Sequence, residues 1–253
     1  MHLEATRCEL RDIQIFRTLF LTESNTQIRY DARHERGWSD SYLLFVDNAP
    51  IGYGSVTGQE LSDRDTIFEF YIVPPYRNLA QQLFRKLWAA SGVKFIECQT
   101  NDSLLHSLTL EFSKSVSSSV ILFSDHTVTH LYIPALTFRQ KTEADLLFKH
   151  QVEPEGSHVI EWKGEVIATG GFLLHYNVPF CDLYMEVRED ARKKGVGSYL
   201  IQELKKECYR AGRIPAARCN IENHPSRATL LKAGMKVSGF MVLGTLENAN
   251  GSF

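Results

Sequence analysis

The chain has 253 residues, enough for one large domain or for two domains of about 100–150 residues that each bury a core. Its residues are 43% hydrophobic, 23% charged and 11% aromatic, a composition typical of soluble globular proteins that excludes a disordered or fibrous chain. The formal net charge of -2 gives no overall electrostatic attraction to nucleic acid or to an anionic membrane, so we expect neither as a partner.

The N-terminal residues, Met1 to Arg7, lack a basic region followed by an apolar run, and nowhere do about 18 apolar residues occur together. We therefore expect a cytoplasmic protein without a cleaved leader. The cysteines are odd in number, widely spaced and free of any C-x-x-C pair, which argues against both a disulfide framework and a zinc site. We expect reduced, mostly buried thiols and no bound metal at Cys8, Cys98, Cys181, Cys208 and Cys219.

The first half of the chain alternates helix and strand patterns. Apolar residues at helical spacing predict a helix over residues 10–22. The following elements are strands at 41–46 and 51–56 around a turn at 47–50, a strand at 67–73, a helix at 80–90 closed by Gly92, and a strand at 93–98. The polar run 113–119 is the nearest thing to a linker, and 120–123 is predicted to be a strand that completes the first half.

The second half repeats this order. Its predicted elements are strands at 159–162, 166–172 and 181–187, a basic glycine loop, a helix at 198–211, a strand at 216–220 and a helix at 225–233. Residues 51–54 align with 167–170, residues 71–73 with 185–187, and Arg77 with Arg192. The pattern predicts two copies of one α/β unit, divided into domains 1–125 and 126–253.

The loop Arg192 to Gly197 lies between a predicted strand and an amphipathic helix. The N-terminus of a helix has free N–H groups and a positive dipole end, which together attract phosphate. Gly195 and Gly197 allow the backbone to approach an anion closely, and Arg192, Lys193 and Lys194 add positive charge. A basic run before a helix can also be a solvated surface, but its place between strand and helix favours an anion site.

This arrangement resembles the GNAT superfamily of N-acetyltransferases, in which a strand, the motif R/Q-x-x-G-x-G/A and a helix bind the pyrophosphate of acetyl-CoA. The resemblance covers residues from about 155 to 245 and includes a second motif, N-x-x-(A/S)-x-x-x-(Y)-x-K-x-G-(F/M), at Asn223 to Met235. It implies a mixed sheet flanked by helices, in two tandem GNAT-like domains, with acetyl-CoA as cosubstrate.

The resemblance also implies which residues bind acetyl-CoA. Met185 and Val187 would offer backbone groups to the pantetheine arm, and Asn223 would contact the pantetheine side of the cofactor. The pyrophosphate would be held by Arg192, Lys193, Lys194, Gly195, Val196, Gly197 and Ser198. Asn223 followed by a proline is equally a helix cap, whether or not it also touches the cofactor.

Acetyl transfer to an amine needs a proton acceptor, and Glu186 is our candidate for the general base. It alternates onto one face of its strand with Asp182 and Tyr184, and an ordinary solvent-facing carboxylate is the competing interpretation. Asp182 and Glu222 are reserve bases. The sequence does not identify the general acid, because Leu230 stands where the family often has tyrosine. Tyr184 and Tyr199 are candidates for the role of that tyrosine.

The first copy lacks the glycines of the loop. Aligned on Arg77, their positions fall on Ala80 and Gln82, whose side chains would intrude on a bound pyrophosphate. We therefore expect the first copy to be a degenerate GNAT unit that does not bind acetyl-CoA, and the second to be intact.

The function expected from the resemblance is an N-acetyltransferase that moves an acetyl group from acetyl-CoA directly to a primary amine of a small molecule or peptide. A catalytically inactive acyl-CoA-binding sensor or regulatory module is the alternative. A nucleotide-binding regulatory domain would have to explain the two motifs separately.

Overall fold

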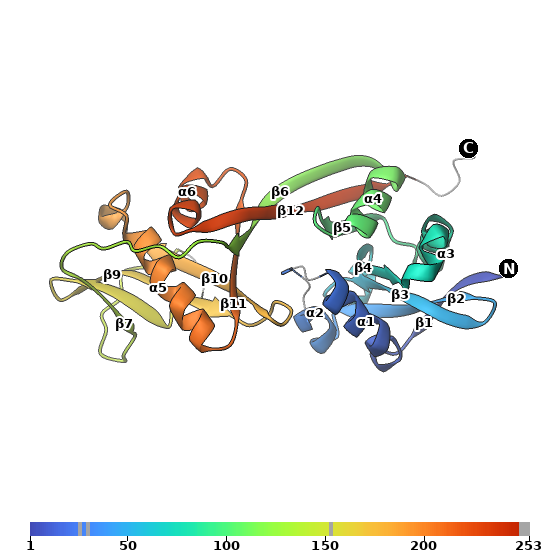
Figure 1. Ribbon diagram of the computed structural model, residues 1–253, viewed down its shortest axis with the longest axis horizontal. Coiled ribbons are helices and arrows are strands. Elements are labelled where there is room, and N and C mark those ends of the chain that lie inside the picture. The colour runs from blue at the N-terminus through green and yellow to red at the C-terminus, as the bar shows by residue number, and fades with distance from the viewer. Residues whose placement is uncertain (25–26, 29–30, 152–153, 248–253) are drawn as a thin grey trace. The chain divides into compact units, whose positions relative to one another are not determined.

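The structure is a computed structural model that describes residues 1–24, 27–28, 31–151 and 154–247 (Figure 1). Contacts divide the chain into two compact units, Met1–Ser119 with Gly239–Phe253, and Val120–Ser238. Strands β6 (Ser113–Asp125) and β12 (Met235–Leu246) each contribute residues to both units. The domain boundary at residue 125 stays a prediction; the compact units divide instead at 119/120 and 238/239.

The sheet of the first unit has the strand order β1, β2, β3, β4, β5, β12. The bounds are Leu3–Cys8 (β1), Ser39–Val46 (β2), Ala49–Thr57 (β3), Thr66–Ile72 (β4) and Phe95–Gln99 (β5). Neighbouring strands are antiparallel except β4 and β5, which are parallel and pair only at Thr66 and Ile67. The strands therefore separate beyond that point.

Helices cover both faces of this sheet. Helix α1 (Leu10–Ser24) packs Ile13 and Phe20 against the tyrosines of β3 and β4, while α3 (Ala80–Ser91) and α4 (Ser103–Phe112) belong to the larger apolar core on the other side. The short helix α2 (Asp31–Glu35) precedes β2, and two 3-10 helices cover Leu61–Asp63 and Pro74–Leu79.

A buried ionic cluster ties α1 and α2 to the sheet of the first unit. Glu69 on β4 is fully buried and accepts two hydrogen bonds of 3.1 Å from Arg17 and one of 3.1 Å from Tyr53. His34 Nε2 lies 3.0 Å from the same carboxylate. Burial alone would raise the pKa of Glu69, but Arg17 and then His34 hold it far below its usual range.

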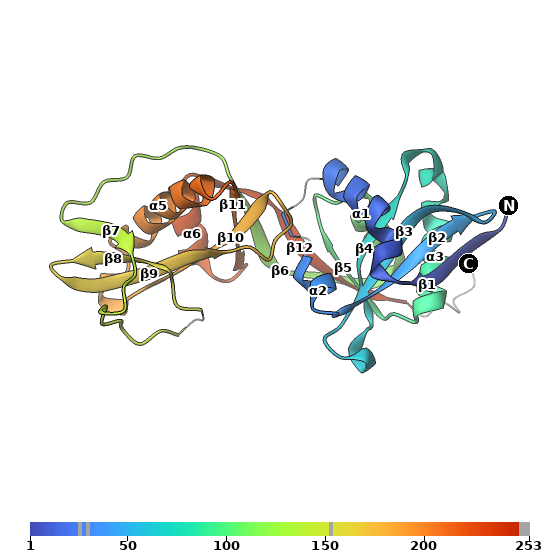
Figure 2. The same cartoon turned by 90° about the horizontal axis from the view of Figure 1, so that it is seen from below.

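The strand order of the second unit is β6, β11, β10, β9, β8, β7. The bounds are Leu136–Gln140 (β7), His158–Trp162 (β8), Glu165–Leu173 (β9), Phe180–Val187 (β10) and Ile214–Asn220 (β11). Only β10 and β11 are parallel. Helix α5 (Val196–Arg210) packs on β9 and β10 (Figure 2), and α6 (His224–Lys232) packs against α5 and β11. A short 3-10 helix covers Glu189–Ala191 before α5.

Strand β6 corrects one expectation. Residues 120–123 were expected to complete the first half, but Val120 to Ser124 pair with β11 in the second unit. The polar run before them is not a linker, because it forms the beginning of the same strand. In the first unit the place beside β5 is taken by β12, through Met241 to Thr245. Local composition could not show this exchange, since pairing partners are far apart in sequence.

Recurring hydrogen bonds establish which residues of the two units correspond. The N–H of Val73 donates to Ile51 O over 3.0 Å, and the N–H of Arg188 donates to Ile167 O over 2.9 Å. Arg77 Nε donates to Ile72 O over 3.1 Å, as Arg192 Nε does to Val187 O over 2.9 Å. Ile72 thus matches Val187, so the sequence alignment of 71–73 with 185–187 was wrong by one residue.

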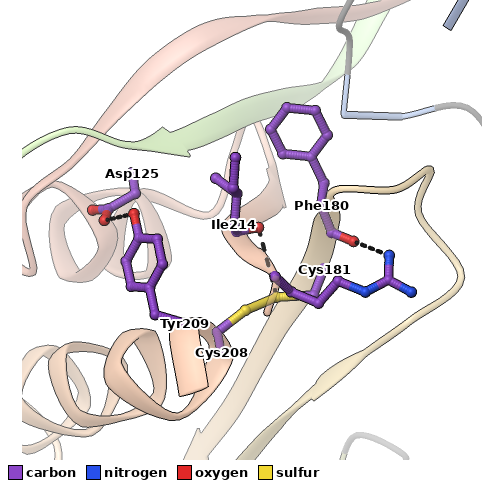
Figure 3. Close-up of a disulfide and its surroundings, with 7 residues drawn as sticks. Asp125, Phe180, Cys181, Cys208, Tyr209 and Ile214 are labelled. Carbon is purple, nitrogen blue, oxygen red and sulfur yellow. Dashed lines mark hydrogen bonds between the residues drawn. A yellow bond between two sulfur atoms is a disulfide. The ribbon is translucent and has the colours of Figure 1, made fainter. Parts of the chain in front are cut away.

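The cysteine expectation was wrong for one pair. Cys181 at the start of β10 and Cys208 near the end of α5 form a disulfide (Figure 3). The two are separated by 27 residues in sequence, but α5 packs back on β10 and brings them together. Cys8, Cys98 and Cys219 are free thiols. None of the described helices is long and apolar enough to cross a membrane.

Candidate acyl-CoA site

The second unit contains a cavity of about 690 Å³ where β10 and β11 separate. The two strands pair only from Phe180 to Asp182, after which β10 continues to Val187 without β11 beside it. The cavity is lined by the end of β10, the basic loop, the start of α5 and one side of α6. Its lining residues are Met185, Glu186, Val187, Ala191, Arg192, Lys193, Gly195, Val196, Gly197, Ser198, Asn223, Pro225, Ser226, Ala228, Thr229 and Lys232.

Gly195 shapes the wall of this cavity at the N-terminus of α5. It is the N-cap residue and has a φ of +83°, a left-handed conformation that glycine adopts without strain. Among the described residues, no acceptor is bonded to the backbone N–H groups of Gly195, Val196, Gly197 or Ser198. These donors therefore face the cavity at the positive end of the helix dipole.

Gly197 has a different role from Gly195. Its φ is not in the left-handed region, but a Cβ there would lie 3.1 Å from Thr229 Cγ2 and 3.2 Å from Met185 Cε. The missing side chain thus allows α5 to pack closely on α6 and β10. The sequence argument that both glycines free the backbone for an anion holds directly for Gly195 only.

The three cations of the basic loop do not act alike. Arg192 and Lys193 line the cavity, and Arg192 Nε is also bonded to the end of β10. Lys194 does not line it. The pKa of Asp190 is lowered mainly by its hydrogen bonds from Arg188, and Lys194 adds a smaller lowering.

Asn223 and Ser198 have structural contacts as well as places in the lining. The side-chain oxygen of Asn223 accepts a hydrogen bond of 3.0 Å from the N–H of Ser226, which caps α6. The Ser198 hydroxyl donates to Thr229 O over 3.1 Å and links α5 to α6. The groups these residues still offer to a ligand are the amide nitrogen of Asn223 and the backbone N–H of Ser198.

Glu186 is the only carboxylate among the lining residues. Both its oxygens lie 3.0 Å from the N–H of Gln151, which holds the side chain in place. The reserve bases lie elsewhere. Asp182 is buried against His175 at 3.3 Å and Arg218 at 3.5 Å, and Glu222 is exposed outside the cavity.

Two family models match the chain. A model described as Acetyltransferase (GNAT) domain matches residues 10–126, and one described as Acetyltransferase (GNAT) family matches residues 126–235. The chain belongs to the GNAT superfamily. It contains two such domains in tandem, and domains of this family use acetyl-CoA as cosubstrate.

Solved structures share this tandem fold. A GNAT-family acetyltransferase from Colwellia psychrerythraea has a TM-score of 0.73 at 14% identity, covering 96% of this chain and 100% of that one. A tandem GNAT protein from the clavulanic acid biosynthesis pathway has a TM-score of 0.57 at 9% identity, covering 99% and 100%. A GCN5-related N-acetyltransferase from Sphaerobacter thermophilus gives 0.57 at 13%, covering 95% and 94%. Such low identities show the fold alone, and no curated protein matches the sequence.

The candidate general acids of the second GNAT domain stand outside the cavity lining. The Tyr184 hydroxyl donates to Glu155 O over 3.3 Å, and burial raises the pKa of this phenol. Burial is also the main cause that raises the pKa of Tyr199. Leu230, at the position where the family often has tyrosine, is buried in the core.

Sequence reasoning missed the contribution of α6 to the GNAT cavity. Pro225, Ala228, Thr229 and Lys232 all line it. Their spacing of three and four residues places them on one face of a helix. This signal was present in the sequence, but the motif predicted roles only for Asn223 and for the position of Leu230.

The first GNAT domain enters its helix α3 differently. The chain passes through the 3-10 helix Pro74–Leu79, and the N–H of Ala80 donates back to Arg77 O. The N-cap residue is Leu79, which is buried and has a φ of -99°, so it takes the place that Gly195 has in the second domain. Leu79 lies two residues after Arg77, whereas Gly195 lies three residues after Arg192, so the first loop is one residue shorter after the arginine. The alignment of the two glycine positions with Ala80 and Gln82 was therefore wrong by one residue.

Proposed function

We propose that the second GNAT domain binds acetyl-CoA in this cavity and transfers the acetyl group to a primary amine of a small molecule or peptide. The observation that carries the proposal is the convergence of the loop, the first turn of α5 and one face of α6 on a single cavity. Unbonded N–H groups, the cations Arg192 and Lys193 and the left-handed Gly195 suit the diphosphate of the cofactor.

The residues fit the remaining parts of acetyl-CoA as well. Beyond Asp182 the edge of β10 that faced β11 is no longer paired with it, and this edge includes Met185 and Val187. The amide groups of a pantetheine arm can hydrogen-bond to such an edge in the way that a neighbouring strand would. We place Lys194 as a nearby charge that does not touch the cofactor.

The bound cosubstrate supplies a thioester carbonyl that a neutral amine can attack. We assign Glu186 the role of accepting the proton of the amine, directly or through one water. Its carboxylate lies in the cavity wall and is oriented by the N–H of Gln151. The attack would form the amide C–N bond and break the thioester C–S bond, and CoA would leave as a thiolate that takes up a proton from water, so no enzyme nucleophile is needed.

The alternative is a domain that binds acyl-CoA without turnover. It is favoured by one observation, the buried Leu230 in place of a tyrosine. Incubation of the full chain with acetyl-CoA and a panel of primary amines, followed by mass spectrometry, distinguishes the two. Acetylated products support the enzyme, whereas tight binding with no product for any amine supports the sensor.

We further propose that the first GNAT domain does not bind acetyl-CoA and that the protein acts in the cytoplasm. Leu79 and the 3-10 turn support the first point, because they replace the glycine entrance to the helix. The disulfide of the structure stands against the second point, since disulfides are rare in cytosolic proteins, and the redox state of Cys181 and Cys208 in cells therefore tests it. Recovery of this pair as a disulfide from acid-quenched cells would argue against the cytoplasm.

A further inference from the structure

Lys232 is the last residue of α6 and lines the cavity. Its Nζ lies 3.6 Å from the position that a Cβ on Gly195 would take. The ammonium group is therefore directly beside the N-cap of α5, where the unbonded N–H groups begin. In the described part of the chain no carboxylate forms an ion pair with Lys232.

The first domain provides an internal comparison for this position. Asp102 caps α4 as Asn223 caps α6: each side chain accepts from the N–H three residues later, and each N–H donates to the residue three before it. Nine residues after these caps stand Glu111 and Lys232. The two helices thus present opposite charges at the same place.

Glu111 is bonded to the start of its neighbouring helix. Its carboxylate accepts a hydrogen bond of 2.9 Å from Gln81, which is the second residue of α3 as Gly197 is of α5. The first domain therefore has a carboxylate and an amide side chain beside the helix N-terminus. The second domain has a cation and a glycine there. A phosphate would be repelled in the first arrangement and attracted in the second.

We infer that Lys232 binds a phosphate group of acyl-CoA, together with the N–H groups at the start of α5, and so supplies the third cation in place of Lys194. The inference rests on the proposed function of the cavity. It also makes the charge at this helix end, positive at Lys232 and negative at Glu111, one reason why the second domain binds the cofactor and the first does not.

The test is the affinity of the full chain for CoA, measured by isothermal titration calorimetry in the wild type and four variants. Lys232→Met should raise Kd by about tenfold or more, as expected for one lost charge-assisted hydrogen bond, and Lys232→Glu by about a hundredfold. Lys232→Arg should restore most of the affinity. Lys236→Met is the matched control, an exposed lysine four residues further that does not line the cavity, and should bind as the wild type does.

A parallel titration with 3′-dephospho-CoA shows which phosphate is bound. If the loss in Lys232→Met persists with this ligand, Lys232 binds the diphosphate; if it disappears, Lys232 binds the 3′-phosphate. Both results support the inference. Thermal unfolding without ligand excludes a purely structural effect, because an exposed lysine at a helix end contributes at most about 1 kcal/mol.

The inference is overturned if Lys232→Met binds both ligands as tightly as the wild type, or if Lys236→Met loses as much affinity. In that case binding by the wild type leaves the proposed function intact. If the wild type binds neither ligand, the proposed function itself fails and the inference fails with it.

Discussion

Substitution of Gly195 by alanine separates backbone strain from loss of the anion site. The residue has a φ of +83°, and a side chain in the left-handed region costs roughly 1–2 kcal/mol. A Cβ there would lie 3.5 Å from Ile133 Cδ1 and 3.6 Å from Lys232 Nζ, which is ordinary contact without a clash. We expect the fold to survive with that loss in the free energy of unfolding.

The effect on ligand binding is additional. The methyl group would lie 3.6 Å from Lys232 Nζ at the N-cap of α5, and would take up room where we propose that a phosphate binds. Loss of one charge-assisted hydrogen bond corresponds to a rise of about tenfold or more in Kd for acetyl-CoA. Calorimetric titration measures the affinity, and urea unfolding measures the stability.

Gly212 provides the matched control. It follows the other end of α5, about 22 Å away, has a φ of +70° and has open space around its Cβ position. Gly212→Ala should lose similar stability and no affinity. Equal affinity in Gly195→Ala and the wild type, or equal losses in both variants, would refute the reasoning.

Three further predictions concern other parts of the chain. Cys208→Ser removes a disulfide that closes a loop of 27 residues, so the free energy of unfolding measured in urea should fall by about 3.5 kcal/mol. An unchanged free energy of unfolding under oxidising conditions would contradict a formed disulfide. Glu69 keeps its charge in the fold to a lower pH than in the unfolded chain, so its stabilisation is complete above pH ~5 and falls as the pH drops through the unfolded pKa and below. Glu69→Gln takes one of two carboxylate partners from the buried Arg17, which keeps its ion pair of 2.8 Å with Asp31. The variant should therefore cost about 2–3 kcal/mol at pH 7 and flatten the stability profile below pH ~5, and an unchanged acid limb would disprove this. Glu186→Gln should lower kcat by about 10²–10⁴-fold with unchanged acetyl-CoA affinity, whereas the exposed Glu222→Gln should keep full activity; equal rates in the two variants would remove Glu186 as the base.

Elements with a strong local signal could be predicted from the sequence. Helices α1, α3, α5 and α6 and strands β2 to β5 and β8 to β11 lie within a few residues of the expected ranges. Gly92, Gly212 and Gly234 all have positive φ at helix ends, as a helix stop requires. Glycine conformation and apolar periodicity are properties of a few consecutive residues, so they can be recognised locally.

Features that depend on distant partners could not be predicted in this way. Strands β1, β7 and β12 and helices α2 and α4 gave no clear periodic signal, and β12 pairs with β5 more than a hundred positions earlier. The Cys181–Cys208 disulfide exists because α5 folds back on β10. The contribution of Lys232 depends on the packing of α6 beside α5, which no single motif describes.

The central claim is that the chain has one acyl-CoA site, in the second GNAT domain. Titration of the full chain with acetyl-CoA tests it most directly, because the stoichiometry counts the sites. We predict one molecule bound per chain in the wild type and a large loss of that binding in Lys232→Glu. Two molecules per chain, or one molecule whose binding is unaffected by Lys232→Glu, would contradict the account.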